Sequence, residues 1–189
     1  MNLEIEQKKK VFGILFMKLD ENQRKNLSTF TSTTKNLIKK KKVASASNIM
    51  GWFDYSMIIY EKSFHDVYYK VEDIRKNLGE FKETVLVIGK YLGSINFNRS
   101  FNDIQIVGII LLKFDPEIKE NPIQIYYSKL KKNLEKSNLK INVYSTFGFH
   151  DFLLWTIGNS MEDIFDFVND LNKSNKFLKE TMTICGKSL

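Results

Sequence analysis

Cysteine, histidine and proline are scarce in this sequence of 189 residues, which contains one, two and two of them, respectively. The single Cys185 excludes a disulfide framework and a cysteine-based metal site, and we expect it to pack as a small buried hydrophobe. With only His65 and His150, the chain has almost no material for a His-based triad or a multi-His metal centre. We therefore predict no catalytic residues and no metal ligands.

Long apolar runs are also lacking, and none approaches the roughly 18 residues that a membrane-spanning helix needs. The first ten residues, MNLEIEQKKK, lead into no apolar region with a small-residue cleavage site. The sequence has no phosphate loop, no Gly-rich dinucleotide turn and no nucleophile elbow. These absences favour a soluble, cytoplasmic protein without a membrane partner.

Positive charge is in moderate excess, with 29 Lys and Arg residues against 22 Asp and Glu residues, a net charge of +7. It is concentrated in two short runs, Lys8–Lys10 and Lys39–Lys42, and the second closes an expected helix. Cations at that position complement the helix dipole, so this run is either a solvated helix end or a phosphate-binding patch. A basic nucleic-acid-binding protein therefore stays open as one alternative.

What the sequence does contain is an internal duplication. The stretch Gly51–Asp54 returns as Gly148–Asp151, and from there to Lys90 and Lys187 the two copies align without a gap. Upstream, VFGILFMKLD from Val11 aligns with IVGIILLKFD from Ile106. A repeat of this kind determines how the whole chain must be divided. We predict repeat one over 10–92, a linker over 93–104 and repeat two over 105–189.

Each repeat has the same expected order of elements. Apolar runs predict strands over 11–19, 43–49, 53–60 and 84–88, and again over 106–114, 141–146, 152–157 and 182–185. Helices are expected near 27–38 and from Pro122, and behind the capping signatures Ser63/Asp66 and Ser160/Asp163. The order β-α-β-β-α-β is that of a ferredoxin-like fold.

Several of these strands are apolar on both faces, so each sheet needs a cover besides its own helices. A unit of this size is also marginal alone, and two units that share a core solve both problems. We therefore predict an α+β protein of two tandem ferredoxin-like repeats that form a pseudo-two-fold dimeric α/β barrel.

The paired glycine turns, the Ser-capped helices and the closing Lys179–Ile184 together resemble the effector-binding domain of the Lrp/AsnC regulators, within the dimeric α/β-barrel superfamily. The stretch Asp73–Thr84 is especially similar to archaeal members with fused tandem copies. Ten residues before the first strand cannot hold the family's helix-turn-helix. The resemblance implies a regulatory small-molecule-binding or assembly module that lacks its own DNA-binding domain, is a homo-oligomer and works with a separate DNA-binding partner protein.

A second resemblance is to the chlorite dismutase and coproheme decarboxylase group, which is also internally duplicated. It rests on Tyr144–Phe152 and on Lys176–Thr181. In that family a His on the first helix of the second repeat holds haem iron, whereas Pro122–Ser137 contains no histidine. A haem oxidoreductase lacking the usual proximal His is therefore the alternative, and no cofactor is predicted otherwise.

We predict that a ligand would bind near the paired turns, with six residues contributing: Gly51, Trp52, Asp54, Gly148, His150 and Asp151. Glycine admits a close backbone approach, and Asp offers acceptors to an amino group or a water. Asp after a glycine turn also commonly bonds nearby backbone N–H groups, so a structural role is the competing interpretation. His150 is either a ligand contact or an ordinary loop residue.

Aromatic side chains gather around the same turns. They could line a pocket, pack in the core or form a base-stacking platform, and core packing is the favoured interpretation. The residues concerned are Trp52, Phe53, Tyr55, Tyr60, Phe149, Phe152 and Trp155.

Overall fold

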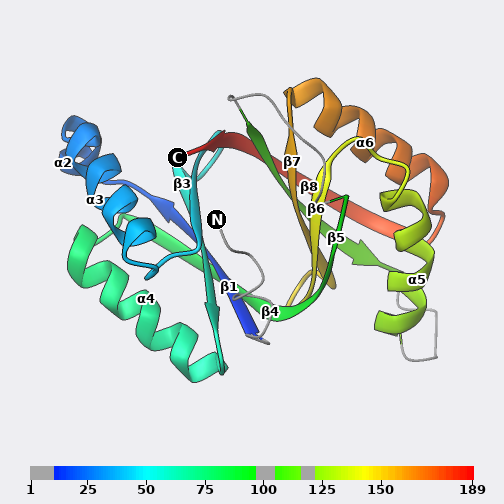
Figure 1. Ribbon diagram of the computed structural model, residues 1–189, viewed down its shortest axis with the longest axis horizontal. Coiled ribbons are helices and arrows are strands. Elements are labelled where there is room, and N and C mark those ends of the chain that lie inside the picture. Colours follow the sequence, from blue (N-terminus) through cyan, green and yellow to red (C-terminus); the bar gives the residue numbers. More distant parts are fainter. Residues whose placement is uncertain (1–10, 97–104, 116–121) are drawn as a thin grey trace. The chain divides into compact units, whose positions relative to one another are not determined.

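The computed structural model describes residues 11–96, 105–115 and 122–189, and it shows an α+β fold with antiparallel strand pairs. Eight strands and five helices lie within these residues (Figure 1). The chain divides into two compact units. Unit 1 contains the described residues up to Tyr91 together with Gly186–Leu189, and unit 2 contains those from Leu92 to Cys185.

Unit 1 is a sheet with helices on one face. Its elements are β1 (Val11–Lys18), α2 (Glu21–Lys25), α3 (Leu27–Lys39), β2 (Ser45–Ile49), β3 (Tyr55–Glu61), α4 (Phe64–Leu78) and most of β4 (Glu83–Ile95). The strand order is β4-β1-β3-β2, with Ile14 opposite Ile58 and Val87. Gly186–Ser188, the end of β8 (Leu178–Ser188), pairs with β2. The helices α3 and α4 cover the sheet (Figure 1).

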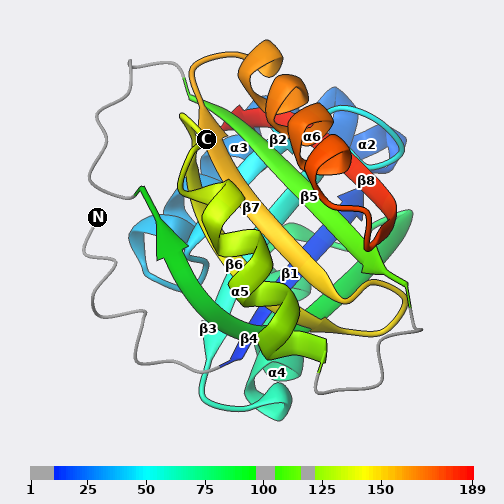
Figure 2. The ribbon, with the colours of Figure 1, turned by 90° about the vertical axis from the view of Figure 1, so that its right-hand side faces the viewer.

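Unit 2 repeats this arrangement. Its elements are β5 (Ile106–Phe114), α5 (Pro122–Leu134), β6 (Lys140–Phe147), β7 (Phe152–Gly158), α6 (Met161–Ser174) and most of β8. The strand order is β8-β5-β7-β6, and the end of β4 lies beside β6, where Ser94 Oγ donates to Asn142 Oδ1 at 2.6 Å. Figure 2 shows α5 and α6 running across the face of β5 and β7.

The predicted helix signals are confirmed. Ser63 Oγ accepts a hydrogen bond from the Asp66 N–H at 3.1 Å, and Ser160 Oγ accepts one from the Asp163 N–H at the same distance. Each cap satisfies a backbone donor that the first helical turn leaves free. Gly79 ends α4 with a φ of 88°, in the left-handed region that suits glycine.

Two predictions of element length were wrong. Residues 20–26, for which no helix was predicted, contain α2, because Asp20 and Gln23 form a capping box. The strands β4 and β8 run well beyond 84–88 and 182–185. The linker over 93–104 stays a prediction, since β4 continues to Ile95 and residues 97–104 lie outside the described part of the chain.

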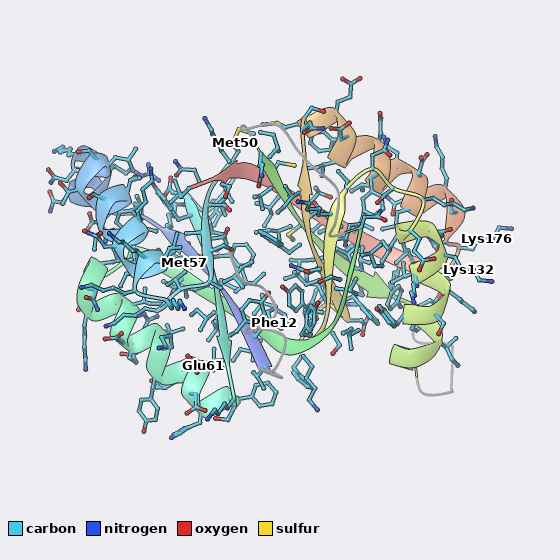
Figure 3. All side chains as sticks on the ribbon, in the orientation of Figure 1. Phe12, Met50, Met57, Glu61, Lys132 and Lys176 are labelled. Atoms are coloured by element: carbon cyan, nitrogen blue, oxygen red, sulfur yellow. The ribbon has the colours of Figure 1, made fainter. Side chains whose placement is uncertain are left out.

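Each unit has its own apolar core between helices and sheet. In unit 1, Met57 of β3 lies toward α3, where it packs with Phe30 and Leu37 (Figure 3). In unit 2, residues of α5 and α6 pack on β5, β6 and β7, and Cys185 joins them at 6% exposure. Cys185 is the small buried hydrophobe that we predicted, and burial raises the pKa of its thiol.

Candidate functional site

The two glycine turns adopt the same backbone conformation in the two repeats. Gly51 and Gly148 have φ values of 130° and 133°, and an added Cβ would meet no atom within 4 Å at either position. Backbone conformation, and not a lack of space, therefore requires glycine here, because L side chains rarely adopt these φ values.

Asp54 joins the turn of unit 1 to the end of β1. Its carboxylate accepts the Leu19 N–H at 2.9 Å and the Arg24 guanidinium at 3.0 and 3.1 Å. The Asp54 N–H in turn donates to the Met17 carbonyl at 2.9 Å. The carboxylate therefore fixes the turn against the neighbouring strand.

Asp151 does the same in unit 2. Its Oδ2 accepts the Phe114 N–H at 2.8 Å, and its own N–H donates to the Leu112 carbonyl at 2.9 Å. These bonds match the structural role that Asp often takes after a tight turn. They use one carboxylate oxygen of Asp151, and ligand binding at these turns stays a prediction.

Trp52 and Phe149 stand exposed at equivalent positions of the two turns, at 66% and 65%. The Lys18 ammonium lies 3.5 Å from the centroid of the Trp52 ring, and the Lys113 ammonium lies 3.3 Å from that of Phe149. Each pair is a cation–π contact, which is weak at an exposed site. The Trp52 indole N–H also donates to Glu83 at 2.8 Å.

Core packing is confirmed for three of the predicted aromatic residues and is wrong for two. Tyr55, Phe152 and Trp155 are at most 7% exposed, whereas Trp52 and Phe149 are among the most exposed apolar side chains. The lysines that contact these rings were not predicted as site residues. The signal was present, because Lys18 and Lys113 coincide when the first strands of the repeats are aligned.

His150 lies beside Phe149, with their ring centroids 5.1 Å apart. Its Nε2 atom is buried and has no hydrogen-bond partner in the described part of the chain. Burial lowers the pKa of this imidazole, and Lys113 lowers it further, while Glu180 and Asp151 oppose the shift. The other histidine, His65, is exposed on α4.

The first helix of repeat two packs directly on its sheet. Tyr126, Leu130 and Leu134 of α5 are at most 2% exposed. The Tyr126 ring stacks on Phe114 at 4.1 Å between centroids, and its hydroxyl donates to the Asp115 carbonyl at 3.0 Å. Burial, together with the nearby carboxylates, raises the pKa of Tyr126. Side chains therefore fill the space between α5 and β5.

Among the described residues, no group of three or more His, Cys, Asp or Glu side chains is placed to hold a metal ion. None of the helices in 11–96, 105–115 and 122–189 is long and apolar enough to cross a lipid bilayer.

Comparison with known proteins shows the fold. No protein-family model matches the sequence, and no curated protein matches it either. Chlorite dismutase from Candidatus Nitrospira defluvii, solved in complex with imidazole, is similar with a TM-score of 0.74 and 14% identity over 100% of this chain and 95% of that one. A mutant of the same enzyme gives 0.72 and 13% identity, over 96% and 92%.

A protein from Lactobacillus acidophilus NCFM, provisionally described as a monooxygenase, is also similar. Its TM-score is 0.63 at 10% identity, over 95% of this chain and 94% of that one. At such identities the likeness shows an α+β, ferredoxin-like fold and no more. Chlorite dismutase belongs to the group that the sequence placed second, and the likeness gives no support to the Lrp/AsnC resemblance.

The haem that the chlorite dismutase resemblance implies does not fit the described structure. Its iron would be held from the first helix of repeat two, but α5 carries no histidine. The inner face of α5 is occupied by Tyr126, Leu130 and Leu134, which are packed against β5. A macrocycle next to this helix would have to displace a close-packed core.

Proposed function

We propose that this chain is a non-catalytic binding and assembly module that uses its outer surface. The observation that carries the proposal is the filled space between α5 and β5 in unit 2, where a haem held from α5 would need a pocket. The polar groups at the paired turns support it, because Asp54 and Asp151 are bound to backbone N–H groups of their own unit.

A haem oxidoreductase is the second candidate, because the fold likeness to chlorite dismutase favours it. Titration with haem and with coprohaem distinguishes the two. We expect no stoichiometric Soret band after gel filtration. A band that persists through purification would overturn the proposal, and its loss in His150→Ala but not in His65→Ala would place the iron near the Gly148 turn.

We further propose that a small-molecule effector, if the module takes one, contacts the turn residues Gly51, Trp52 and Asp54 of repeat one or Gly148, His150 and Asp151 of repeat two. A thermal-shift screen of a ligand library tests this. Stabilising compounds should lose their effect on Asp54→Ala or Asp151→Ala. Compounds that stabilise both variants as well as the parent protein would place the site elsewhere.

We also propose that the two ferredoxin-like repeats form a pseudo-two-fold α/β barrel with one shared core. The repeated element order and the full-length fold likeness support this. Residues 1–92 and 93–189 produced separately should each lack a cooperative thermal transition, because neither contains all strands of its unit. Two independently folded halves would contradict a shared core.

A cytoplasmic location and a separate DNA-binding partner protein remain part of the proposal.

A further inference from the structure

Unit 1 carries a cluster of lysines where α3 ends, here named the basic corner and made up of Lys39, Lys40, Lys41 and Lys42. Lys42 forms an ion pair with Asp73 of α4 at 2.8 Å, which holds the corner against the neighbouring helix. The Lys42 ammonium, hydrogen-bonded to Asp73, lowers the pKa of that carboxyl group. The other three lysines are exposed, and none has an ion-pair partner within the described residues.

Lys41 has a feature that backbone geometry does not explain. Its φ is 57°, in the left-handed region, and it directly follows a helix end. Glycine or asparagine suits this position best, since a Cβ is disfavoured there. The backbone at Lys41 therefore suits glycine better than lysine.

The corresponding corner of unit 2 has the opposite charge. A cleft of about 320 Å³ lies between the end of α5 and α6, and it is named here the acidic cleft. Its charged lining is Asp163, Asp166 and Asp170 of α6 with Lys136, which follows α5. Asp163 also caps α6 by accepting the Ser160 N–H at 3.0 Å.

The acidic cleft is electrostatically unfavourable on its own. Asp166 and Asp170 are both exposed and are four residues apart on one helix, where like charges repel. Neither has an ion-pair partner within the residues that the structure describes. A cationic occupant would relieve this repulsion. The unit-1 counterparts of these two positions are Tyr69 and Asp73, and Asp73 already has its cation in Lys42.

The distribution of charged residues along the sequence follows the same difference between a basic and an acidic corner. In the sequence, residues 1–91 with 186–189 hold 18 Lys and Arg residues against 11 Asp and Glu residues, whereas residues 92–185 hold 11 of each. The excess of positive charge therefore lies in the part of the sequence that contains unit 1. One chain thus displays two corners built from equivalent elements, one basic and one acidic.

We propose that the basic corner of one molecule docks on the acidic cleft of a second copy. This rests on the proposed assembly function and names the surfaces that carry it. The contact joins two different surfaces, so it is heterologous. A second copy fits better than a nucleic acid, because Asp66, Glu72 and Asp73 interrupt the positive charge along α4 and leave no continuous track for phosphates.

Charge reversal on each surface tests the contact. Sedimentation at about 50 mM salt should give the parent protein an average mass above the 22.2 kDa of one chain, falling to that value at about 500 mM. Lys39→Glu/Lys40→Glu/Lys41→Glu and Asp166→Lys/Asp170→Lys should each be monomeric. A mixture of the two should form a heterodimer, since each retains one intact surface. A parent protein that stays monomeric, or a mixture that does, would overturn the proposal.

Two control variants distinguish loss of the contact from a general change in net charge and from a loss of stability. Lys62→Glu/Lys176→Glu/Lys179→Glu makes the same change in net charge at positions outside the basic corner and should leave association unchanged. Lys41→Gly removes one charge while relieving the backbone, so it should melt no lower than the parent protein and yet associate more weakly. If Lys41→Gly associates as the parent protein does, the basic corner is not the contact.

A labelled single-stranded oligonucleotide identifies the competing partner. If the basic-corner variant loses oligonucleotide binding while its mass at low salt matches that of the parent protein, the lysines serve a nucleic acid and the proposal fails. The haem titration is independent of both surfaces. A Soret band would contradict the proposed function, whereas loss of the mixed heterodimer would contradict only this inference.

Discussion

The two units share a backbone and differ in what they place on it. The turn of unit 1 presents Trp52, whose indole bonds Glu83, and anchors Asp54 with a guanidinium. The turn of unit 2 presents Phe149, which cannot donate a hydrogen bond, and adds His150 with a buried nitrogen that has no partner among the described residues. Both turns have kept the features that fix the backbone, namely a glycine with a positive φ and an Asp carboxylate that accepts a backbone N–H. Side chains outside those interactions have diverged.

Close packing occurs at Gly13 and Gly108, which occupy equivalent positions in β1 and β5. A Cβ at Gly13 would lie 2.6 Å from Val67, and one at Gly108 would lie 2.5 Å from the Thr156 hydroxyl and 2.8 Å from Ile164. Overpacking of this kind costs about 1–3 kcal/mol. We expect Gly108→Ala to be the more damaging, because it also disturbs the buried bond from Thr156 to the Gly108 carbonyl. Urea unfolding of both variants measures the difference, and equal losses would contradict the ranking.

Removing the carboxylates of the turns should come next. Asp151→Ala leaves the Phe114 N–H without its acceptor, and Asp54→Ala does the same to Leu19, at a cost of about 1–3 kcal/mol each. The matched Asn variants keep an acceptor oxygen. Asp54→Asn should therefore lose only the half-exposed ion pair with Arg24, which contributes about 1 kcal/mol at most. Asn variants as unstable as the Ala variants would show that charge, and not the backbone bond, matters here.

A smaller change in the free energy of unfolding is expected at two buried threonines, and its sign differs between them. The Thr34 hydroxyl of unit 1 is buried without a partner in the described structure, whereas the Thr156 hydroxyl of unit 2 donates to Gly108 at 3.0 Å. Valine has nearly the same shape as threonine but no hydroxyl. We expect Thr34→Val to raise the free energy of unfolding by about 1 kcal/mol and Thr156→Val to lower it by a similar amount. Thermal melts of the pair decide this, and a loss in Thr34→Val would reveal a partner for its hydroxyl.

The smallest expected effect is the pH dependence that His150 gives to unit 2. Burial lowers the pKa of His150 below its usual 6.5, so between that folded value and 6.5 the unfolded chain binds more protons. Stability should therefore fall as the pH drops below about 6.5, and this contribution should vanish at higher pH. His150→Gln should flatten that part of the curve. Urea midpoints from about pH 5 to about pH 8 test it, with His65→Gln as the matched control. Identical curves for the parent protein and His150→Gln would contradict it.

Much of this fold was predictable, because its signals are local. Cap residues such as Ser63 and Ser160, and apolar runs such as Ile106–Phe114, depend on near neighbours in the sequence. The extra length of β4 and β8 was not predictable from their own residues. Beyond Lys90 and Gly186 these strands pair with strands far away in the sequence, and pairing of this kind leaves little local pattern.

The site was less predictable for a related reason. An Asp after a glycine turn can face either a ligand or a backbone N–H, and its neighbours in the sequence do not decide which. The N–H groups that Asp54 and Asp151 accept belong to Leu19 and Phe114, which lie 35 and 37 residues away in the sequence. The exposure of the Trp52 side chain could not be predicted either, because an aromatic-rich stretch of sequence does not show which rings are buried. The alignment of the repeats contained one usable signal, the matching positions of Lys18 and Lys113, since an aromatic and a cation retained together in both copies indicate a contact.

The crossing of β8 from unit 2 into unit 1 has a practical consequence for spectroscopy. A fluorophore attached at Ser188 would sit opposite Ser47 and report the surroundings of unit 1, although it belongs to the second repeat in the sequence. A fluorophore at Ser94 would report the second repeat from the end of a strand that begins in the first. Labels placed by sequence position alone would therefore exchange the two signals.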